Sequence, residues 1–257
     1  MKKLSATSIA KSLAALALVT WAGASFAAST WTFNNCTTCT GTNGASSVAV
    51  TAFGVDNGSG ATYAGATVGF NAGSGLGVLS GGESGDPEHA VDNNTRTDAL
   101  LLNFGAQLVE LDVMQIGFKS GDADISLFRY TGVAPVAAGA APAVTGLTIA
   151  GLAVAGWTLV GNYADLAVNT DKNVNTNNTA SSWWLVSAYN SNFGTTTSDG
   201  TAVTGGGSVD GTLDYFKFLS VTGTVRTSNV PEPGSLALLG LGLVGLVASR
   251  RRKPASI

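Results

Sequence analysis

The fold class is decided by residues 100–118, which read LLLNFGAQLVELDVMQIGF. Apolar residues occupy every second position on both sides of Gly105, at 100, 102 and 104 and again at 109, 111 and 113, and this period of two is the pattern of strands that bury one face. The apolar positions change parity between residues 113 and 114, which predicts a β-bulge in the second strand. We therefore expect two strands here, separated by a turn at Gly105.

The same period of two recurs along the body of the chain. Gly, Asn, Asp and Ser cluster between the apolar runs, as expected for turns, and no stretch of the body shows an apolar period of 3.6 residues. These features predict an all-β fold, an antiparallel β-sandwich or barrel, over residues 28–228. Further strands are expected at residues 48–52, 126–130, 157–160, 183–189 and 215–221.

Charge is scarce and unevenly distributed. Only 11% of the residues are Asp, Glu, Lys or Arg, a composition typical of extracellular β-proteins, and the formal net charge is −3. Between residues 28 and 230 there are six basic and 15 acidic residues, a net charge of −9, because the other basic residues lie near the two ends. An acidic body repels phosphate backbones, so we expect no nucleic acid partner.

The first residues have the features of a cleaved signal helix. Two lysines precede an apolar stretch at residues 9–19, and small residues gather at 22–27. Ser25 and Ala27 suit the −3 and −1 positions of a signal-peptidase site. The sequence therefore predicts a signal peptide of residues 1–27 and export through the Sec translocon; the alternative is an uncleaved membrane anchor.

The last residues form three consecutive parts. An apolar run of about 15 residues would be roughly 22 Å long as a helix, which is short against a hydrocarbon core of roughly 30 Å. The basic cluster after it would stay cytoplasmic. The three parts are Pro231-Glu232-Pro233, the predicted transmembrane helix at 235–249, and Arg250-Arg251-Arg252-Lys253.

In their order and place, these parts resemble the PEP-CTERM sorting signal of Gram-negative bacteria, here over residues 229–253. The resemblance implies transient residence in the inner membrane, processing by an exosortase, and delivery to the cell surface or the extracellular space. It also implies a producer that makes exopolysaccharide, which is an expected partner. A plain C-terminal anchor is the alternative.

The body resembles two further groups. Residues 89–130 are similar to the opening of discoidin-like, galactose-binding-type jelly rolls, through the segment Ala-Val-Asp-Asn-Asn-Thr and a strand that ends at Phe-Gly. A closer resemblance is to the XDP-type family of exosortase-dependent surface proteins, which implies a secreted surface protein without an assigned activity. The segments that carry it are 87–93, 156–163, 182–190 and 214–217.

Few residues could carry catalysis. His89 is the only histidine, so one chain cannot form a histidine-rich metal site. No Gly-x-Ser-x-Gly motif lies between a strand and a helix. We therefore expect no catalytic residues and no enzyme, with a hydrolase that uses His89 and a neighbouring acid as an alternative.

The two cysteines, Cys36 and Cys39, form a Cys-Thr-Thr-Cys motif. The motif lacks the βαβ context of a redox pair, and zinc would need four ligands where only two thiolates exist. A local disulfide is the expected state of an exported protein. Redox chemistry is the alternative.

Acidic residues in turn-rich segments are candidate calcium ligands, because calcium prefers carboxylate and carbonyl oxygens. No EF-hand spacing or nonapeptide repeat is present, and solvated loop acids are the alternative explanation. No other cofactor is expected. The candidate ligand residues are Asp86, Glu88, His89, Asp92, Asp122 and Asp124.

Trp183 and Trp184 are candidates for stacking on sugars. They face opposite sides of a strand, so at most one of them belongs to the core. The function we expect is that of a non-enzymatic surface or matrix protein sorted through an exosortase. A calcium-assisted carbohydrate-binding module is the first alternative.

Overall fold

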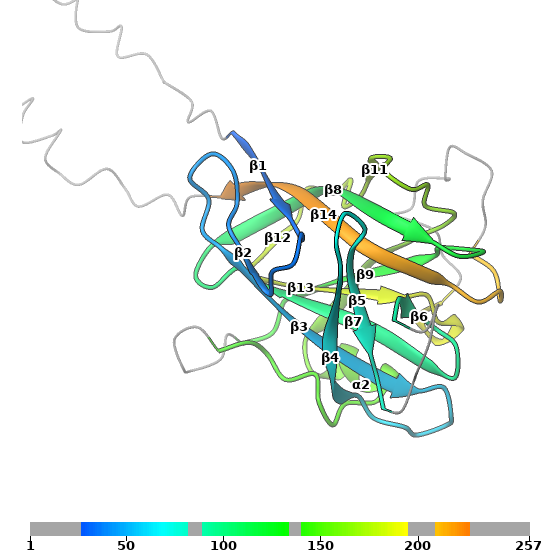
Figure 1. Ribbon diagram of the computed structural model, residues 1–257. Coiled ribbons are helices and arrows are strands. Elements are labelled where there is room, and N and C mark those ends of the chain that lie inside the picture. The colour runs from blue at the N-terminus through cyan, green and yellow to red at the C-terminus, as the bar shows by residue number, and fades with distance from the viewer. Residues whose placement is uncertain (1–26, 82–88, 134–139, 195–208, 227–257) are drawn as a thin grey trace, which may run out of the picture.

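The computed structural model describes residues 27–81, 89–133, 140–194 and 209–226 (Figure 1). These residues are mostly antiparallel β-structure, which confirms the predicted all-β class. Within the described ranges there are two short helices, α2 (Ile149–Val154) and the 3-10 helix η2 (Ser191–Phe193). The strands are β1 (Ala28–Thr32), β2 (Thr38–Cys39), β3 (Val48–Asp56), β4 (Ala64–Asn71), β5 (Gly75–Leu79), β6 (Val91–Asp92), β7 (Arg96–Asn103), β8 (Leu108–Lys119), β9 (Ile125–Tyr130), β10 (Trp157–Tyr163), β11 (Lys172–Asn173), β12 (Ala180–Ser181), β13 (Trp183–Ala188) and β14 (Tyr215–Arg226).

The strands form one continuous sheet that curls into a half-barrel, in the order β10-β9-β13-β7-β3-β4-β5-β14-β8-β11. Strand β4 makes the sheet continuous, because residues 64–66 pair with β3 and residues 67–71 pair with β5. We call the strands from β10 to β3 the β7 half and those from β5 to β11 the β14 half. The jelly-roll and galactose-binding-like assignment stays a prediction.

The predicted bulge lies in β8. Val113 pairs with Thr222 and Leu111 with Gly223, so Asp112 is an extra residue on β8. Its effect is visible in the burial of the strand: Leu111 and Met114, three residues apart, are both completely buried. The change of parity read from the sequence is therefore confirmed, and it keeps the apolar side of β8 on the core through the bend.

The main core lies between the two halves of the sheet. Both halves contribute fully buried side chains to it, and Trp184 lies among them with 0% exposure. Members include Val50, Leu100 and Leu102 from the β7 half and Leu111, Ile116, Phe216 and Phe218 from the β14 half.

A second apolar cluster covers the outer face of the β7 half. It joins Leu101, Leu185 and Trp157 to Leu152 of α2. The strands of this half are therefore buried on both faces, which explains why residues 99–102 are apolar without interruption. The helix itself corrects the expectation of a body without helices: the Thr148 side chain caps it by accepting from Gly151 N, and its buried face packs on the sheet.

No helix among the described residues has the length and apolar character needed to cross a membrane. The predicted signal helix and the predicted C-terminal transmembrane helix lie outside the described residues.

Candidate functional site

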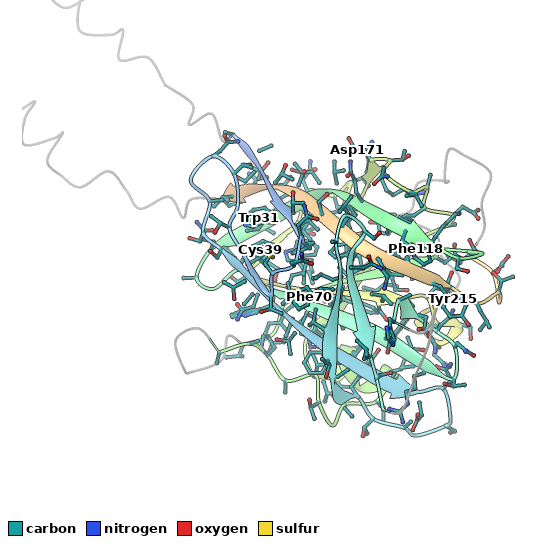
Figure 2. The ribbon with its side chains drawn as sticks, in the orientation of Figure 1. Trp31, Cys39, Phe70, Phe118, Asp171 and Tyr215 are labelled. Atoms are coloured by element: carbon teal, nitrogen blue, oxygen red, sulfur yellow. A yellow bond between two sulfur atoms is a disulfide. The ribbon has the colours of Figure 1, made fainter. Side chains whose placement is uncertain are left out.

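Aspartates from distant parts of the chain meet where β9 and β14 begin. Asp122 and Asp124 precede β9, and Asp214 precedes β14. The backbone bridges Asp122 to Asp214 in parallel fashion, and Asp124 N donates to Asp214 Oδ1 at 2.6 Å. We call this end of the molecule, with Asp210, the acidic pole. Tyr215, the first residue of β14, marks it in Figure 2.

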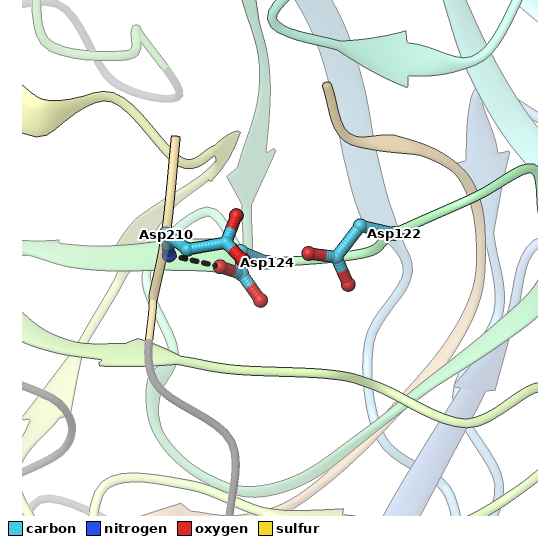
Figure 3. A group of neighbouring side chains, drawn as sticks. All are labelled: Asp122, Asp124 and Asp210. Carbon is cyan, nitrogen blue, oxygen red and sulfur yellow. Dashed lines mark hydrogen bonds between the residues drawn. The ribbon is translucent and has the colours of Figure 1, made fainter. Parts of the chain in front are cut away.

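Three of these carboxylates lie close enough to share a cation. Oxygens of Asp122, Asp124 and Asp210 all lie within 4.8 Å of one another (Figure 3). Asp124 is buried, Asp122 is half-buried and Asp210 is exposed, so the group runs from the interior to the surface. Clustered carboxylates of this kind are suited to a hard divalent cation such as calcium.

Backbone N–H groups hold the central carboxylate in position. Asp124 Oδ1 accepts from Asp165 N at 2.8 Å, and Asp124 Oδ2 accepts from Asp210 N at 3.1 Å. Asp122 Oδ2 accepts from Thr212 Oγ1 at 2.9 Å. These bonds tie the segment before β14 to the start of β9 and orient the three carboxylates relative to one another.

Asp214 is fixed by a reciprocal pair of hydrogen bonds with Asn93. Asn93 Nδ2 donates to Asp214 Oδ2 at 2.7 Å, and Asp214 N donates to Asn93 Oδ1 at 2.8 Å. Asn93 Nδ2 also donates to Tyr189 O at 2.9 Å, which fixes the orientation of the amide. The loop after β6 is thereby joined to the acidic pole.

The electrostatics of the pole reflect its burial and its uniform sign. Burial raises the pKa of Asp214 to about 8, and the nearby acids Asp124, Asp122 and Asp210 add to the rise. Burial raises the pKa of Asp124 to about 6 against the opposing effect of its two N–H donors. The pKa of Asp210 is instead lowered, because Thr212 donates to its carboxylate. The outer carboxylate is thus charged at neutral pH, whereas Asp214 holds its proton.

One cation approaches the pole from the described residues around it. Lys172 Nζ donates to Ala164 O at 3.0 Å. Burial lowers the pKa of Lys172, while the charges of Asp165 and Asp124 oppose that shift. Lys172 thus donates to a backbone carbonyl oxygen, and no hydrogen bond from it to the carboxylates of the pole is seen among the described residues.

A polar pocket of about 230 Å³ adjoins the acidic pole. Its wall includes Asp210 and Thr212 together with Asn57, Asn93 and Asn190. A larger hollow of about 550 Å³ lies next to it between the turn after β3 and the start of α2. Asn57 and Asn192 line both hollows, so the two are contiguous.

The predicted calcium loop is brought together only in part. Asp122 and Asp124 lie in the acidic pole, while Asp86 and Glu88 lie outside the described residues. Asp92 is completely buried in β6, where its Oδ1 accepts from Asn94 N at 2.9 Å. The carbonyl oxygen of His89 accepts from Lys217 Nζ at 2.6 Å.

The two tryptophans lie on opposite faces of β13, as their spacing predicts. Trp184 has 0% exposure in the main core, and its Nε1 donates to Val109 O and Ser181 O, each at 3.1 Å. It therefore cannot stack on a sugar, which corrects that expectation. Trp183 is half-buried on the outer face and contacts Tyr130 edge-on, with ring centroids 5.8 Å apart.

Cys36 and Cys39 form a disulfide, with Cα atoms 5.5 Å apart. It lies between β1 and β3, in the region labelled by Trp31 and Cys39 in Figure 2. The bond closes a short loop and contributes no ligand atoms to the acidic pole.

The sequence-based prediction missed Asp210, Asp214 and Asn93. Asp210 and Asp214 lie about 90 positions from Asp124, so no local spacing joins them. One signal was present: both precede the predicted strand at 215–221, as Asp122 and Asp124 precede the strand at 126–130. Acids that precede two strands beginning at the same edge of a sheet are candidates for one site.

The comparison with protein families identifies the terminal segment. Residues 229–253 match the family described as the PEP-CTERM protein-sorting motif. Comparison with curated proteins and with solved structures gave no significant match. PEP-CTERM signals mark proteins exported to the cell surface or the extracellular space in Gram-negative bacteria. The resemblance of the body to the XDP-type family stays a prediction. The predicted sorting signal is confirmed by this match: the chain carries a PEP-CTERM protein-sorting motif at residues 229–253.

Proposed function

We propose that this chain is a non-enzymatic protein of the cell surface or extracellular matrix, that an exosortase processes it, and that it associates with exopolysaccharide. The observation that carries the proposal is the sorting motif at residues 229–253. Strand β14 ends at Arg226, three residues before the motif. The motif therefore begins within roughly 11 Å of the folded domain, the reach of three extended residues.

The arrangement of the ends supports this role. Ala28, the predicted first residue of the mature chain, pairs with Thr224 near the end of β14. Both chain ends therefore leave the domain together, at the upper left of Figure 1. The acidic pole lies at the other end of β14, roughly 36 Å away for 12 extended residues. A domain held at the membrane by its tail would direct the acidic pole outward.

The proposal that the protein is not an enzyme rests on the surroundings of His89. Among the described residues, no hydrogen bond joins its imidazole to a Ser, Thr or acidic side chain. A triad needs both partners within hydrogen-bonding reach. A hydrolase that uses His89 stays an alternative prediction, which the variant His89→Ala tests against any hydrolytic activity found.

Replacing Pro231, Glu232 and Pro233 by alanine tests the sorting proposal. We expect the variant to keep its tail and to accumulate in the membrane fraction, because the processing enzyme no longer recognises it. Intact mass spectrometry and cell fractionation are the measurements. Alanine at Thr227 and Ser228 is the matched control and should be processed normally. Normal processing of the first variant would refute the sorting proposal. If the protein associates with the matrix equally well in a strain that makes no exopolysaccharide, the proposed association with exopolysaccharide is refuted.

A second candidate function is a calcium-assisted carbohydrate-binding module. The observation that favours it is the set of three carboxylates within 4.8 Å, one of which also lines the polar pocket. A cation held by Asp122, Asp124 and Asp210 would relieve their mutual repulsion and join the start of β9 to the segment before β14. Its role would be to hold the pocket wall in place.

Calorimetric titration of the EDTA-treated protein with CaCl₂ tests this candidate. We expect saturable binding and a higher melting temperature with calcium, because the cation binds the folded state. Asp122→Asn should weaken binding at least tenfold. Asp171→Asn, whose exposed side chain bonds to Gln115, is the control. An unchanged melting temperature in millimolar calcium would remove the candidate.

A further inference from the structure

The wall of the polar pocket is a preorganised set of amide and hydroxyl groups. Asn190 Nδ2 donates to Thr97 Oγ1 at 2.7 Å, and Thr97 Oγ1 donates to Asn57 Oδ1 at 2.6 Å. Asn57 Nδ2 donates to Asn93 O at 2.7 Å. These bonds hold the wall in one arrangement, and Ser191, Asn192 and Thr212 line the same pocket. Polar groups can therefore be presented to a ligand with little loss of entropy. A ligand rich in hydroxyl groups matches such a wall.

The charge of the pocket has one sign. Among the described residues that line it, Asp210 is the single acid and none is Lys, Arg or His. Behind Asp210 lie Asp124 and Asp122, whose carboxylate oxygens are within 4.8 Å of its own. Lys172, the cation near these acids, bonds to Ala164 O instead. An anionic ligand would be repelled here and a cationic one attracted.

The two hollows together have a size that suits part of a saccharide chain. The pocket of about 230 Å³ is below the roughly 300 Å³ at which pockets for drug-sized ligands begin. It therefore has room for a single sugar ring. The adjoining hollow of about 550 Å³ shares Asn57 and Asn192 with it and offers space for the neighbouring units of an oligosaccharide.

We propose that this pocket binds a saccharide unit with a protonated amino group, a hexosamine that is not N-acetylated, with its ammonium group on Asp210 and its hydroxyl groups on the asparagine wall. The inference rests on the proposed association with exopolysaccharide and names the class of sugar. It predicts a preference for cationic over neutral and acidic chains. Asp210 is suited to this role because it is exposed and lines the pocket.

The test uses the processed protein recovered from the producing cells and three tetrasaccharides: chitosan tetraose, chitin tetraose and tetragalacturonate. The first two differ only in the N-acetyl groups. Calorimetry at 20 mM and 150 mM salt should show that chitosan tetraose binds at least fivefold tighter than chitin tetraose. The preference should shrink at the higher salt concentration, because salt screens exposed charges.

Asp210→Asn is the diagnostic variant, since it removes the charge and keeps the shape. It should weaken chitosan binding about threefold to fivefold, the effect of one exposed ion pair, and leave chitin binding unchanged. Asp171→Asn removes an equal charge from a residue that does not line the pocket and should have no effect. Equal or tighter binding of chitin or galacturonate would overturn the sugar class and leave the matrix role intact. No binding of any tetrasaccharide would overturn the pocket itself, whereas the matrix role is judged by fractionation.

Discussion

Replacing Asp214 by Asn should change how the stability of the protein depends on pH. Asp214 is 1% exposed, and its two oxygens accept from Asp124 N at 2.6 Å and Asn93 Nδ2 at 2.7 Å. Burial and the neighbouring acids raise its pKa from 3.8 to about 8 in the folded protein. The unfolded chain loses this proton near pH 4, and the folded chain keeps it.

The sign and magnitude follow from this difference. Below pH 3.8 both states carry the proton, and stability is highest with respect to this group. Between there and about pH 8 only the folded state binds it, so stability falls by about 1.4 kcal/mol per pH unit. The total is on the order of 5 kcal/mol, and the slope vanishes at higher pH. Asp124, with a pKa of about 6, adds a loss of the same sign at lower pH.

The Asn variant should lose the contribution of residue 214 to this slope. Its amide would place a donor against Asn93 Nδ2, which costs about 1–3 kcal/mol. At pH 5 the wild type has already lost about 1.7 kcal/mol through this group, so we expect the two proteins to have similar stability there. Between pH 5 and pH 8 the free energy of unfolding of the wild type should fall by about 4 kcal/mol relative to that of the variant.

Urea denaturation at pH 5, 6.5 and 8, with EDTA to exclude divalent cations, measures both proteins. Asp171→Asn is the control, because that acid is exposed, and it should follow the wild type at all three pH values. Stability curves of Asp214→Asn and wild type that run parallel from pH 5 to pH 8 would refute the reasoning.

Two further substitutions test the packing. Trp184→Ala should lower the free energy of unfolding by about 3–5 kcal/mol. The loss should exceed that of Trp183→Ala, because of the two only Trp184 is completely buried. Equal losses in urea denaturation would contradict the assignment of the two faces. Gly77→Ala should destabilise by about 3 kcal/mol or more, since a methyl group there would overlap the carbonyl oxygen of His89, whereas Gly65→Ala meets no atom within 4 Å and should be nearly neutral. A stable Gly77→Ala protein, judged by its melting temperature, would show that β5 does not approach His89 this closely.

The strands were largely predictable because their signal is local. The alternation around Gly105 and the parity change after residue 113 depend on neighbours two or three positions apart, and the bulge at Asp112 follows from them. Helix α2 was not predictable in this way. It has six residues and one completely buried side chain, Leu152, so it shows no periodic pattern. Its stability comes from packing on the β7 half.

The candidate site was predictable only in part. Asp122 and Asp124 stood out as two acids before a strand, but nothing local joined them to Asp210 and Asp214. Strand pairing brings these residues together. Strands β8 and β14 pair along their whole length, so the end of β8 lies beside the start of β14, and Asp122 bridges to Asp214 there. The two tryptophans show the same limit, since alternation says that they face opposite sides and does not say what covers each side.

The amino-acid sequence by itself determined the β class, the presence of a bulge in the strand after Gly105 and the sorting motif at residues 229–253, because each is written in residues close together along the chain. Tertiary structure alone decided that β4 joins the two halves, that the β7 half is covered on both faces, and that acids about 90 positions apart form one pole beside an asparagine-lined pocket. The physical reason is that strand pairing and the burial of the second face are settled by contacts between distant segments. The sorting motif gives the route of the protein, and the acidic pole is where its ligand should be sought.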